Sequence, residues 1–409
     1  MSSKSLTLFY RTKAFHMFII TLLTFFIFTL LHLYDVVFMI FSDETIYIKA
    51  GLAYLNGVMP YNFNFEHPPL AKYIIGFFSI LNMGFLLPSI ALSLTIIVAS
   101  YIIYRYLNYA RAFLYVILVT TDTLIINMSF FNLLDNIVLP LLVLFMYITL
   151  SHITFKRYHN LDSAKNTCII LGILAGLALA SKWSSIYVMM PMFIILCLLD
   201  KKIMKNIPLF IIMTIISYTL PFTMDFIRGG PYLFIIHNVD MVKYMIWRHS
   251  ITLPLMINGF LTLVGKISFW LHQYHEYLTL TIINSTNINY TVFMTKVGNL
   301  LMEFNFWLGS FAWPLMFYYS LKLTYDSAKK KDHIWTLISS AIIGSILLPI
   351  FHGNIAWYYV FYAILAPFAM IKYAPKKLLV LAIGLNVAQI ILLKSGVLNA
   401  TYSFSFSIS

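Results

Sequence analysis

The chain has 409 residues, of which 61% are hydrophobic and only 10% are charged. A water-soluble domain of this length could not cover itself with polar surface, so the composition excludes one. The apolar runs are long and continuous and lack the two-residue alternation of barrel strands, which excludes a transmembrane β-barrel. The expected fold class is therefore an all-α polytopic membrane protein.

Apolar windows of about 20 residues mark the expected membrane helices in chain order. The first window is too long for the core of a signal peptide and has no small-residue cleavage site, so it is expected to stay as a membrane helix. Fusion of the fifth and sixth spans, and a further pair hidden in the half-polar stretch 231–271, are open alternatives. About eleven spans are predicted, at 14–40, 87–105, 111–127, 132–151, 167–181, 184–200, 207–226, 300–320, 334–351, 355–371 and 377–394.

The charges predict the orientation of these spans. With the N-terminus inside and the C-terminus outside, most of the 27 Lys and Arg residues fall in inner segments, as the positive-inside rule requires. Most of the 14 Asp and Glu residues fall in outer loops or outer halves of helices, which implies a water-filled cavity open to the outer face. For Asp122, Asp240 and Glu276, a solvated loop position is an equal alternative. The net charge of +13 follows from this topology, and its spread over many loops excludes nucleic acid as the expected partner.

The first outer loop, 42–86, holds an unusual concentration of ionisable residues. Asp43–Glu44 lies at the exit of the first span, and 46–55 reads as an amphipathic helix along the interface that breaks at Gly57 and Pro60. A second short helix is expected to start at Pro68 or Pro69, because proline suits the first turn of a helix. Glu66–His67 then stands at a helix entry, where it can meet Asp43–Glu44 over one cavity.

The remaining segments carry less chemistry. The long outer loop 228–299 mixes apolar and polar stretches and is expected to form a re-entrant or interfacial cover, while 399–409 is a polar, Ser-rich tail at the exterior end. Cys168 and Cys197 sit within apolar spans, so the chain has no disulfide framework and no Cys-based zinc site. The sequence names no cofactor, and a divalent metal stays an open alternative. We expect residues 1–409 to form one integral-membrane domain.

Several motifs, taken in order, resemble one family. Asp43–Glu44 is followed by His-Pro-Pro-Leu-Ala-Lys at 67–72, Leu-Leu-Asp at 133–135, and a small-residue stretch from Gly172 that ends in Ser-Lys-Trp at 181–183. This order is similar to that of the dolichyl-phosphate-mannose protein O-mannosyltransferases, and Trp307, Trp313 and the aromatic run 357–362 continue the likeness. The resemblance spans most of the chain and suggests a compact, prokaryotic-type member without a MIR domain.

The resemblance implies a GT-C type membrane glycosyltransferase in the plasma membrane of a prokaryote, with its active site facing outside. Such an enzyme takes a mannosyl or similar residue from a polyprenyl or dolichyl phosphate and passes it, with inversion, to Ser or Thr hydroxyls of proteins. Two alternatives stay open. One is a GT-C transferase that uses another polyprenyl-phosphate sugar or a lipid acceptor, and the other is a secondary transporter. The sequence gives no oligomeric state.

The resemblance also implies residue roles. Asp43 would be the general base that a weak hydroxyl nucleophile needs, and Glu44 would bind the acceptor or hold the first loop. For the donor phosphate, the candidates are the cations on the outer side, with Asp135 orienting a lysine or sugar hydroxyls, or else capping its helix. Many family members carry an arginine where this chain has Phe130, and an Asp two residues before the His where it has Phe65, with Glu66 next to it. The substrate-binding candidates are Glu66, His67, Lys72, Asp135, Lys182 and Trp183.

Overall fold

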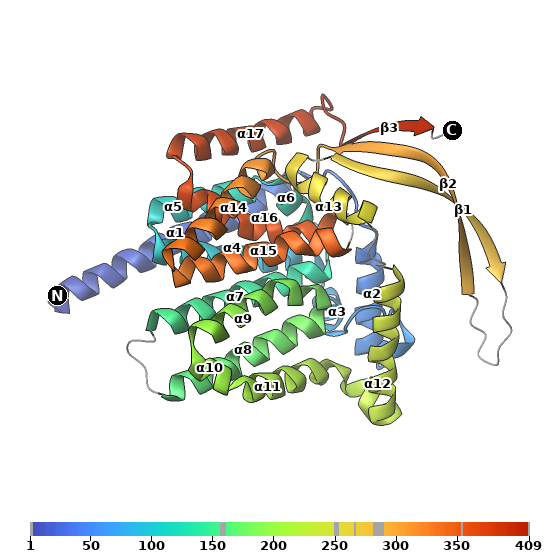
Figure 1. The fold of residues 1–409 in the computed structure, drawn as a ribbon, viewed down its shortest axis with the longest axis horizontal. Coiled ribbons are helices and arrows are strands. Elements are labelled where there is room, and N and C mark those ends of the chain that lie inside the picture. Colours follow the sequence, from blue (N-terminus) through green and yellow to red (C-terminus); the bar gives the residue numbers. More distant parts are fainter. Residues whose placement is uncertain are drawn as a thin grey trace.

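The computed structural model describes residues 3–155, 161–248, 253–265, 267–280, 290–352 and 355–407. Helices make up most of this part of the chain (Figure 1). The helices of the first half are α1 Ser3–Leu33, α2 Asp43–Leu55, η1 Pro60–Asn62, α3 Leu70–Ile80, η2 Gly84–Leu86, α4 Leu87–Tyr106, α5 Tyr109–Thr120, α6 Thr123–Met128, α7 Leu134–Phe155, α8 Leu161–Ser181, η3 Trp183–Ser185, α9 Ile186–Leu199 and α10 Lys201–Lys205.

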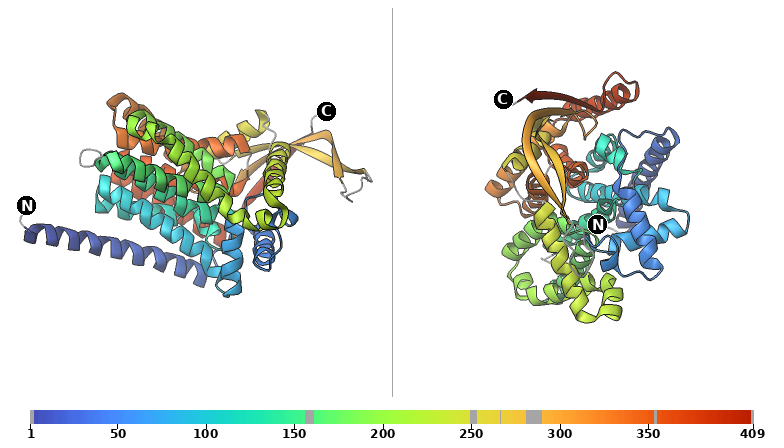
Figure 2. Two further views of the ribbon diagram at one scale, coloured as in Figure 1. Left: turned by 90° about the horizontal axis from the view of Figure 1, so that it is seen from below. Right: turned by 90° about the vertical axis from the view of Figure 1, so that its right-hand side faces the viewer.

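The second half adds further helices and the strands. It comprises α11 Ile207–Thr219, η4 Leu220–Phe222, α12 Thr223–Arg248, α13 Leu253–Gly265, β1 Ile267–Leu280, β2 Tyr290–Asn305, α14 Trp313–Lys330, α15 His333–His352, η5 Ala356–Tyr359, α16 Val360–Tyr373, α17 Lys376–Lys394 and β3 Thr401–Ser407. The elongated helices lie side by side as a bundle, with α1 and α17 on its outside (Figures 1 and 2).

The spans predicted from the sequence coincide with helices of this bundle. Each of the eleven spans overlaps a helix, and seven described helical segments are long and apolar enough to cross a membrane. The chain is thus a multi-pass membrane protein, while the count of eleven spans stays a prediction. Two spans were wrong in detail. Span 300–320 begins in β2, and its helix α14 starts only at Trp313, while span 111–127 is divided between α5 and α6.

A three-stranded sheet is the main departure from the expected all-α fold. Its order is β1-β2-β3, both pairings are antiparallel, and it projects from one end of the bundle (Figure 1). The region 228–299 supplies most of α12, all of α13 and most of a hairpin, with parts of it outside the described residues. Its expected role as a re-entrant or interfacial cover stays a prediction. The tail pairs with β2 from Asn305↔Thr401 to Asn299↔Ser407. A hydropathy window cannot separate strands rich in aromatic and β-branched residues from a short apolar helix.

Small residues bring two of the bundle helices into close contact. A Cβ added at Gly172 of α8 would lie 2.6 Å from the Phe210 carbonyl oxygen, and one at Gly176 would lie 2.4 Å from that of Thr214. These two glycines are four residues apart and so lie on the same face of α8. The spacing lets the α8 and α11 backbones meet, as small residues do between membrane helices.

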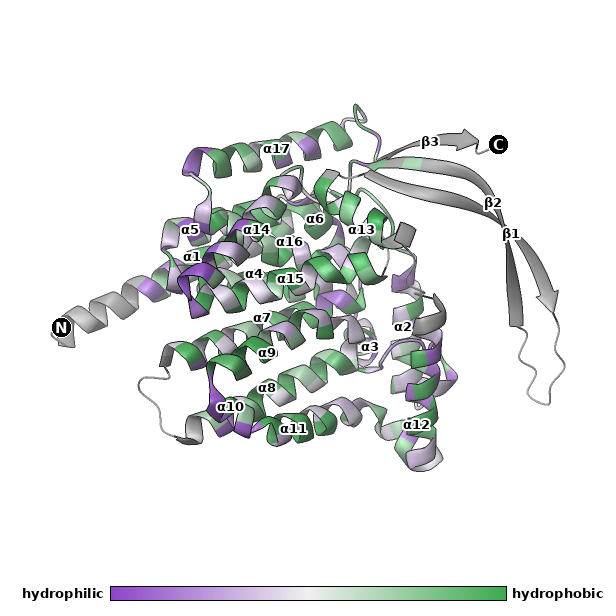
Figure 3. Cartoon of the chain, viewed as in Figure 1, coloured by the Kyte–Doolittle hydropathy of each residue, from purple (hydrophilic) through white to green (hydrophobic). Residues whose placement is uncertain are grey.

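The two ends of the bundle differ in character. The lysine-bearing α10 lies at one end, and α2, α3, α12 and the sheet lie at the other (Figure 1). Figure 3 shows hydrophobic residues along most of the helices between these ends. The acidic first loop and the basic α10 are therefore on opposite sides of the apolar region, as the charge pattern predicted.

Candidate active site

Helices α2 and α3 form the base of the site because two glycines let them touch. A Cβ added at Gly51 would lie 2.0 Å from the Lys72 carbonyl oxygen, and one at Gly76 would lie 2.4 Å from the Gly51 carbonyl carbon. Only glycine fits at such a crossing. Asp43 and Glu44 occupy the first turn of α2, where the partial positive charge of a helix N-terminus favours acidic side chains.

Asp43 faces a cavity of about 340 Å³, which we call the carboxylate cavity. The Tyr47 hydroxyl donates to Asp43 Oδ2 at 3.3 Å. Burial raises the pKa of Tyr47, and the charges of Asp43 and Asp135 raise it further, so this phenol stays protonated and keeps its donor. The cavity is lined by Asp43, Ile46, Tyr47, Phe63, Asn64, Glu66 and His67. Of the expected meeting of Asp43–Glu44 with Glu66–His67 over one cavity, the part that concerns Asp43 is confirmed, while Glu44 is not among the lining residues.

Glu44 does not line this cavity and instead holds the loop in place. Its Oε1 accepts hydrogen bonds from both the backbone N and the side-chain Nδ2 of Asn132, each at 2.8 Å. Asn132 precedes α7, so Glu44 ties the start of α2 to the start of a bundle helix. Of the two roles expected for Glu44, these contacts favour holding the first loop.

Glu66 and His67 line two spaces at once. Asn64 Nδ2 donates to Glu66 Oε2 at 2.6 Å, and the His67 ring lies edge-on to Tyr47 with 6.1 Å between centroids. Beyond the carboxylate cavity, both residues also line a smaller space that we call the lysine cavity. Its lining is Glu66, His67, Pro68, Lys182, Trp183, Ser184 and Tyr358.

Lys182 is paired with Asp135 and buried. Its Nζ lies 2.6 Å from Asp135 Oδ2 and 4.7 Å from the centroid of the Tyr358 ring. Asp135 comes from the first turn of α7, and Lys182 immediately precedes η3. The second carboxylate oxygen, Asp135 Oδ1, is buried without a hydrogen-bond partner among the described residues, so it can accept from a ligand hydroxyl.

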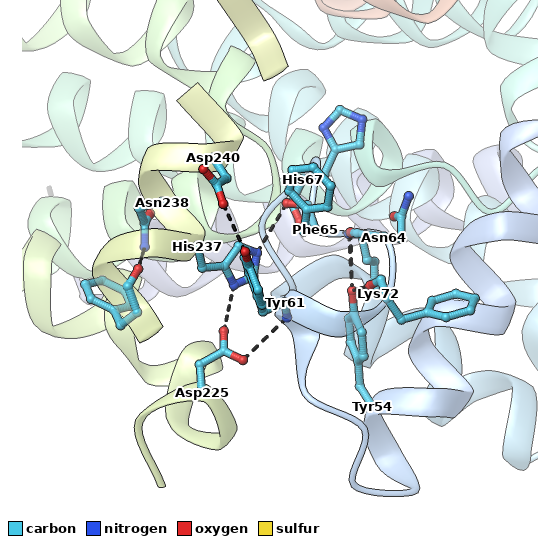
Figure 4. Close-up of polar contacts among 12 residues, drawn as sticks. Tyr54, Tyr61, Asn64, Phe65, His67, Lys72, Asp225, His237, Asn238 and Asp240 are labelled. Carbon is cyan, nitrogen blue, oxygen red and sulfur yellow. Dashed lines mark hydrogen bonds and ion pairs between the residues drawn. The ribbon is translucent and has the colours of Figure 1, made fainter. Parts of the chain in front are cut away.

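Lys72 has a different place from the one expected of a phosphate ligand. It is fully buried, and its Nζ donates to the carbonyl oxygens of Asn64 and His67, the latter at 2.8 Å, and to the Tyr54 hydroxyl at 3.4 Å (Figure 4). Burial lowers the pKa of Lys72 to about 7, which the charge of Glu66 partly opposes. Two of these acceptors are carbonyl oxygens of the loop and the third is the Tyr54 hydroxyl of α2, so Lys72 fixes the chain at 64–67 against α2. The sequence could not reveal this, because backbone carbonyls leave no motif.

Trp183 connects the lysine cavity to an apolar groove of about 500 Å³. Trp183 Nε1 donates to the Tyr218 hydroxyl at 3.0 Å, and that hydroxyl donates to Asn238 Oδ1 at 2.5 Å. The apolar groove is lined by Leu179, Trp183, Ile186, Thr214, Ile215, Tyr218, Asn238 and Val242. Sequence reasoning missed this groove, because its lining comes from segments that are distant in the chain.

Asp122 and Asp240, for which a solvated loop position was an equal alternative, both make hydrogen bonds to other parts of the protein. Asp122 caps α6 through Leu124 N, and its Oδ2 accepts from Ser310 N and Trp313 Nε1, which makes it a buried packing residue. Asp240 accepts from the Tyr61 hydroxyl at 3.0 Å and so contacts the first loop. The side chain of Glu276 lies outside the described residues. Within the described part of the chain, no three His, Cys, Asp or Glu residues gather into a metal-binding group.

The comparisons with known proteins bear on this arrangement. Residues 66–224 match the family described as dolichyl-phosphate-mannose-protein mannosyltransferase, a segment that includes all six predicted substrate-binding residues but begins after Asp43. No curated protein matches the chain. The fold is similar to that of ArnT from Cupriavidus metallidurans bound to undecaprenyl phosphate, with a TM-score of 0.56 and 14% identity. The chain has the GT-C fold. The similarity covers 97% of this chain and 64% of the ArnT chain.

Proposed function

We propose that this chain is a GT-C glycosyltransferase that moves a mannosyl or similar residue from a polyprenyl or dolichyl phosphate to Ser or Thr hydroxyls of proteins. The reaction takes place on the outer membrane face, inverts the anomeric centre, and uses Asp43 as general base. The match of residues 66–224 to the mannosyltransferase family supports the reaction class. The similarity of the fold to a structure bound to undecaprenyl phosphate supports a polyprenyl-phosphate donor.

The observation that carries this proposal is the shared lining of three spaces. Trp183 belongs to both the apolar groove and the lysine cavity, and Glu66 and His67 belong to both the lysine cavity and the carboxylate cavity. In this arrangement, the groove would take the apolar polyprenyl chain, the lysine cavity the anionic phosphate, and the carboxylate cavity the hydroxyl nucleophile. The groove and the carboxylate cavity each have the size of ordinary ligand sites, about 300–1,000 Å³. The lysine cavity between them is only about 10 Å³, so its side chains must move apart to admit a phosphate group.

The chemistry is a single displacement. The acceptor hydroxyl oxygen forms the new bond to the anomeric carbon, while the bond from that carbon to the phosphate oxygen breaks and its electron pair leaves with the polyprenyl phosphate. Asp43 takes the hydroxyl proton, which makes the weak nucleophile competent. Lys182 stabilises the charge of the departing phosphate from the lysine cavity, and Asp135 Oδ1 is free to accept from a sugar hydroxyl.

The test uses the purified full-length protein with dolichyl-phosphate mannose and a Ser/Thr-rich peptide. We expect Asp43→Asn to lower peptide labelling by about 10²–10⁴-fold, because it removes the proton acceptor and little volume. Asp35→Asn is the matched control, since Asp35 is exposed and lies outside the cavities. Peptide labelling that survives Asp43→Asn would refute the assignment of the base.

A lipid acceptor is the second candidate, and a further pocket favours it. A space of about 440 Å³ is lined by Ser42, the residue before Asp43 in the chain, and by mostly apolar side chains, among them Phe41, Trp307 and Trp357. Such a lining suits an acceptor with an apolar part. Membranes containing the protein, supplied with radiolabelled polyprenyl sugars, distinguish the two candidates. Label that moves into another extractable lipid, with none in peptide, supports the lipid acceptor.

A further inference from the structure

A buried polar cluster joins α12 to the first loop, outside the cavities described above. His237 and Asp225 both have fully buried side chains, with 2.6 Å between Nδ1 and Oδ2. They lie on either side of Gly230, whose φ of 67° breaks α12 into two arms. This side-chain contact therefore joins the two arms of the helix across the break (Figure 4).

The same cluster holds the loop that carries Glu66 and His67. His237 Nε2 lies 3.2 Å from the Phe65 carbonyl oxygen, and the Tyr61 backbone N donates to Asp225 Oδ1 at 3.4 Å. The Tyr61 hydroxyl donates to Asp240 Oδ2 at 3.0 Å. Figure 4 shows these contacts reaching from one helix to a short stretch of loop. Because Phe65 directly precedes Glu66, its carbonyl fixes the chain at the point where the two cavities share their lining.

Asn238, the residue after His237 in α12, contacts the side of the site that holds the apolar groove. Asn238 accepts from Tyr218, which accepts from Trp183, and Asn238 also lines the apolar groove. Of two successive residues of α12, His237 thus contacts the Phe65 carbonyl, just before Glu66–His67, and Asn238 lines the groove. A helix in this position sets the geometry between the two substrate environments.

We propose that His237, held by Asp225, is a positioning residue for transfer: it fixes the Glu66–His67 segment through the Phe65 carbonyl and so aligns the carboxylate cavity with the lysine cavity. This inference rests on the proposed function. A small misplacement of a positioning segment lowers the rate of the chemical step far more than it weakens binding of a substrate anchored elsewhere.

Two amide substitutions separate the two nitrogens of His237. His237→Asn keeps a donor near the Nδ1 position for Asp225 and loses the donor to Phe65. His237→Gln keeps a donor near Nε2 for Phe65, and it is combined with Asp225→Asn so that no buried carboxylate is left without a partner. Ile235→Ala is the control, since Ile235 is an exposed residue of α12 outside the groove and the cluster.

With dolichyl-phosphate mannose and peptide, we expect His237→Asn to lower kcat by about 10- to 100-fold with the donor KM changed less than about threefold. The double variant, which keeps a donor to Phe65, should lose less kcat than His237→Asn, and Ile235→Ala should stay within about threefold of the parent protein in both constants. If His237→Asn keeps its kcat while the double variant loses it, the pair serves only to lock α12, and the proposal is overturned. Equal losses in both variants also overturn it.

Amide hydrogen exchange tests positioning without any need for turnover. In the protein without substrate, residues 61–67 should exchange faster in His237→Asn than in the parent or the double variant, while the bundle helices exchange alike. This readout separates a failure of the inference from a failure of the proposed function. If the His237 variants do not fold, the parent protein carries the test, because a segment that His237 fixes should be protected: residues 61–67 should exchange more slowly than the exposed turn at 81–83. Exchange at 61–67 as fast as at 81–83 then overturns the proposal.

Discussion

At the scale of single residues, the site depends on a buried ion pair that serves both stability and chemistry. Lys182 and Asp135 have side chains only 4% and 2% exposed, with 2.6 Å between Nζ and Oδ2. Removing one member leaves the other charge buried without its partner, whereas removing both at once does not. The pair therefore offers a way to separate the structural part of its role from the part in catalysis.

We expect Lys182→Met to lower thermal stability markedly, by about 3–5 kcal/mol, and transfer by about 10²–10³-fold. Lys182→Met combined with Asp135→Leu should recover most of the stability but none of the transfer. Thermal unfolding in detergent and peptide labelling give the two readouts. Lys243→Met is the control for a lysine in an exposed pair, because Lys243 is 71% exposed, and it should cost less than about 1 kcal/mol. Transfer that returns with stability in the double variant would contradict a role for Lys182 in the reaction.

The sequence predicted part of this residue chemistry. Scarcity of charge in an apolar chain singled out Asp43, Glu66, His67 and Lys182. Asp43 and Lys182 line separate cavities, and Glu66 and His67 line both, while the roles of all four stay predictions. The sequence misassigned Lys72, because its partners are carbonyl oxygens of the loop, and it missed the Asp225–His237 pair. Both errors have the same cause. These contacts form because tertiary folding brings separate segments together, and the residue types alone do not specify which segments meet.

At the scale of elements, the crossing of α2 and α3 determines where Asp43 lies. Gly51 and Gly76 meet backbone to backbone, so an added methyl group at Gly51 cannot be absorbed by a side-chain rotation. The two helices would have to separate, which moves the whole of α2 relative to Lys72 and the loop behind it.

We expect Gly51→Ala to lower the free energy of unfolding by about 1–3 kcal/mol and to reduce transfer as well. Gly384→Ala in α17 is the matched control, since an added Cβ there meets nothing within 4 Å, and alanine favours a helix interior by about 1 kcal/mol. Thermal unfolding and labelling of both variants check this. If Gly51→Ala and Gly384→Ala have the same free energy of unfolding, the α2–α3 contact accommodates the added methyl group without loss of stability, and the prediction is wrong.

Sequence patterns located the elements unevenly. Long apolar helices such as α4 and α7 follow from hydropathy alone, because a continuous apolar run of this length has few other uses. The sheet was missed, since the pairing of β1 with β2 extends to Ile267 and Phe304, which lie farther apart than a window of about 20 residues, and β3 pairs with β2 from the far end of the chain. Whether a segment forms a β-strand depends on the segment it pairs with, and local composition does not predict that partner.

At the scale of the whole molecule, the charge partition and the fold agree on two distinct ends. Lys201 is exposed on α10, far from α2 and the sheet (Figure 1). The C-terminal end of α17 lies beside the root of the sheet, and Ser395 just after it is exposed. The positive-inside rule assigns the first position to the inner side and the second to the outer side.

Cysteine labelling in intact cells tests this orientation. Cys168 and Cys197 are buried, which keeps the background low. We expect a membrane-impermeant maleimide to label Ser395→Cys in intact cells, and Lys201→Cys only after permeabilisation, because the lysine-rich end faces inward. Labelling of both variants after permeabilisation is the control for accessibility. The reverse pattern would put Asp43 and the three connected spaces on the inner side, and an acceptor exposed at the outer surface would then be unable to reach the proposed base.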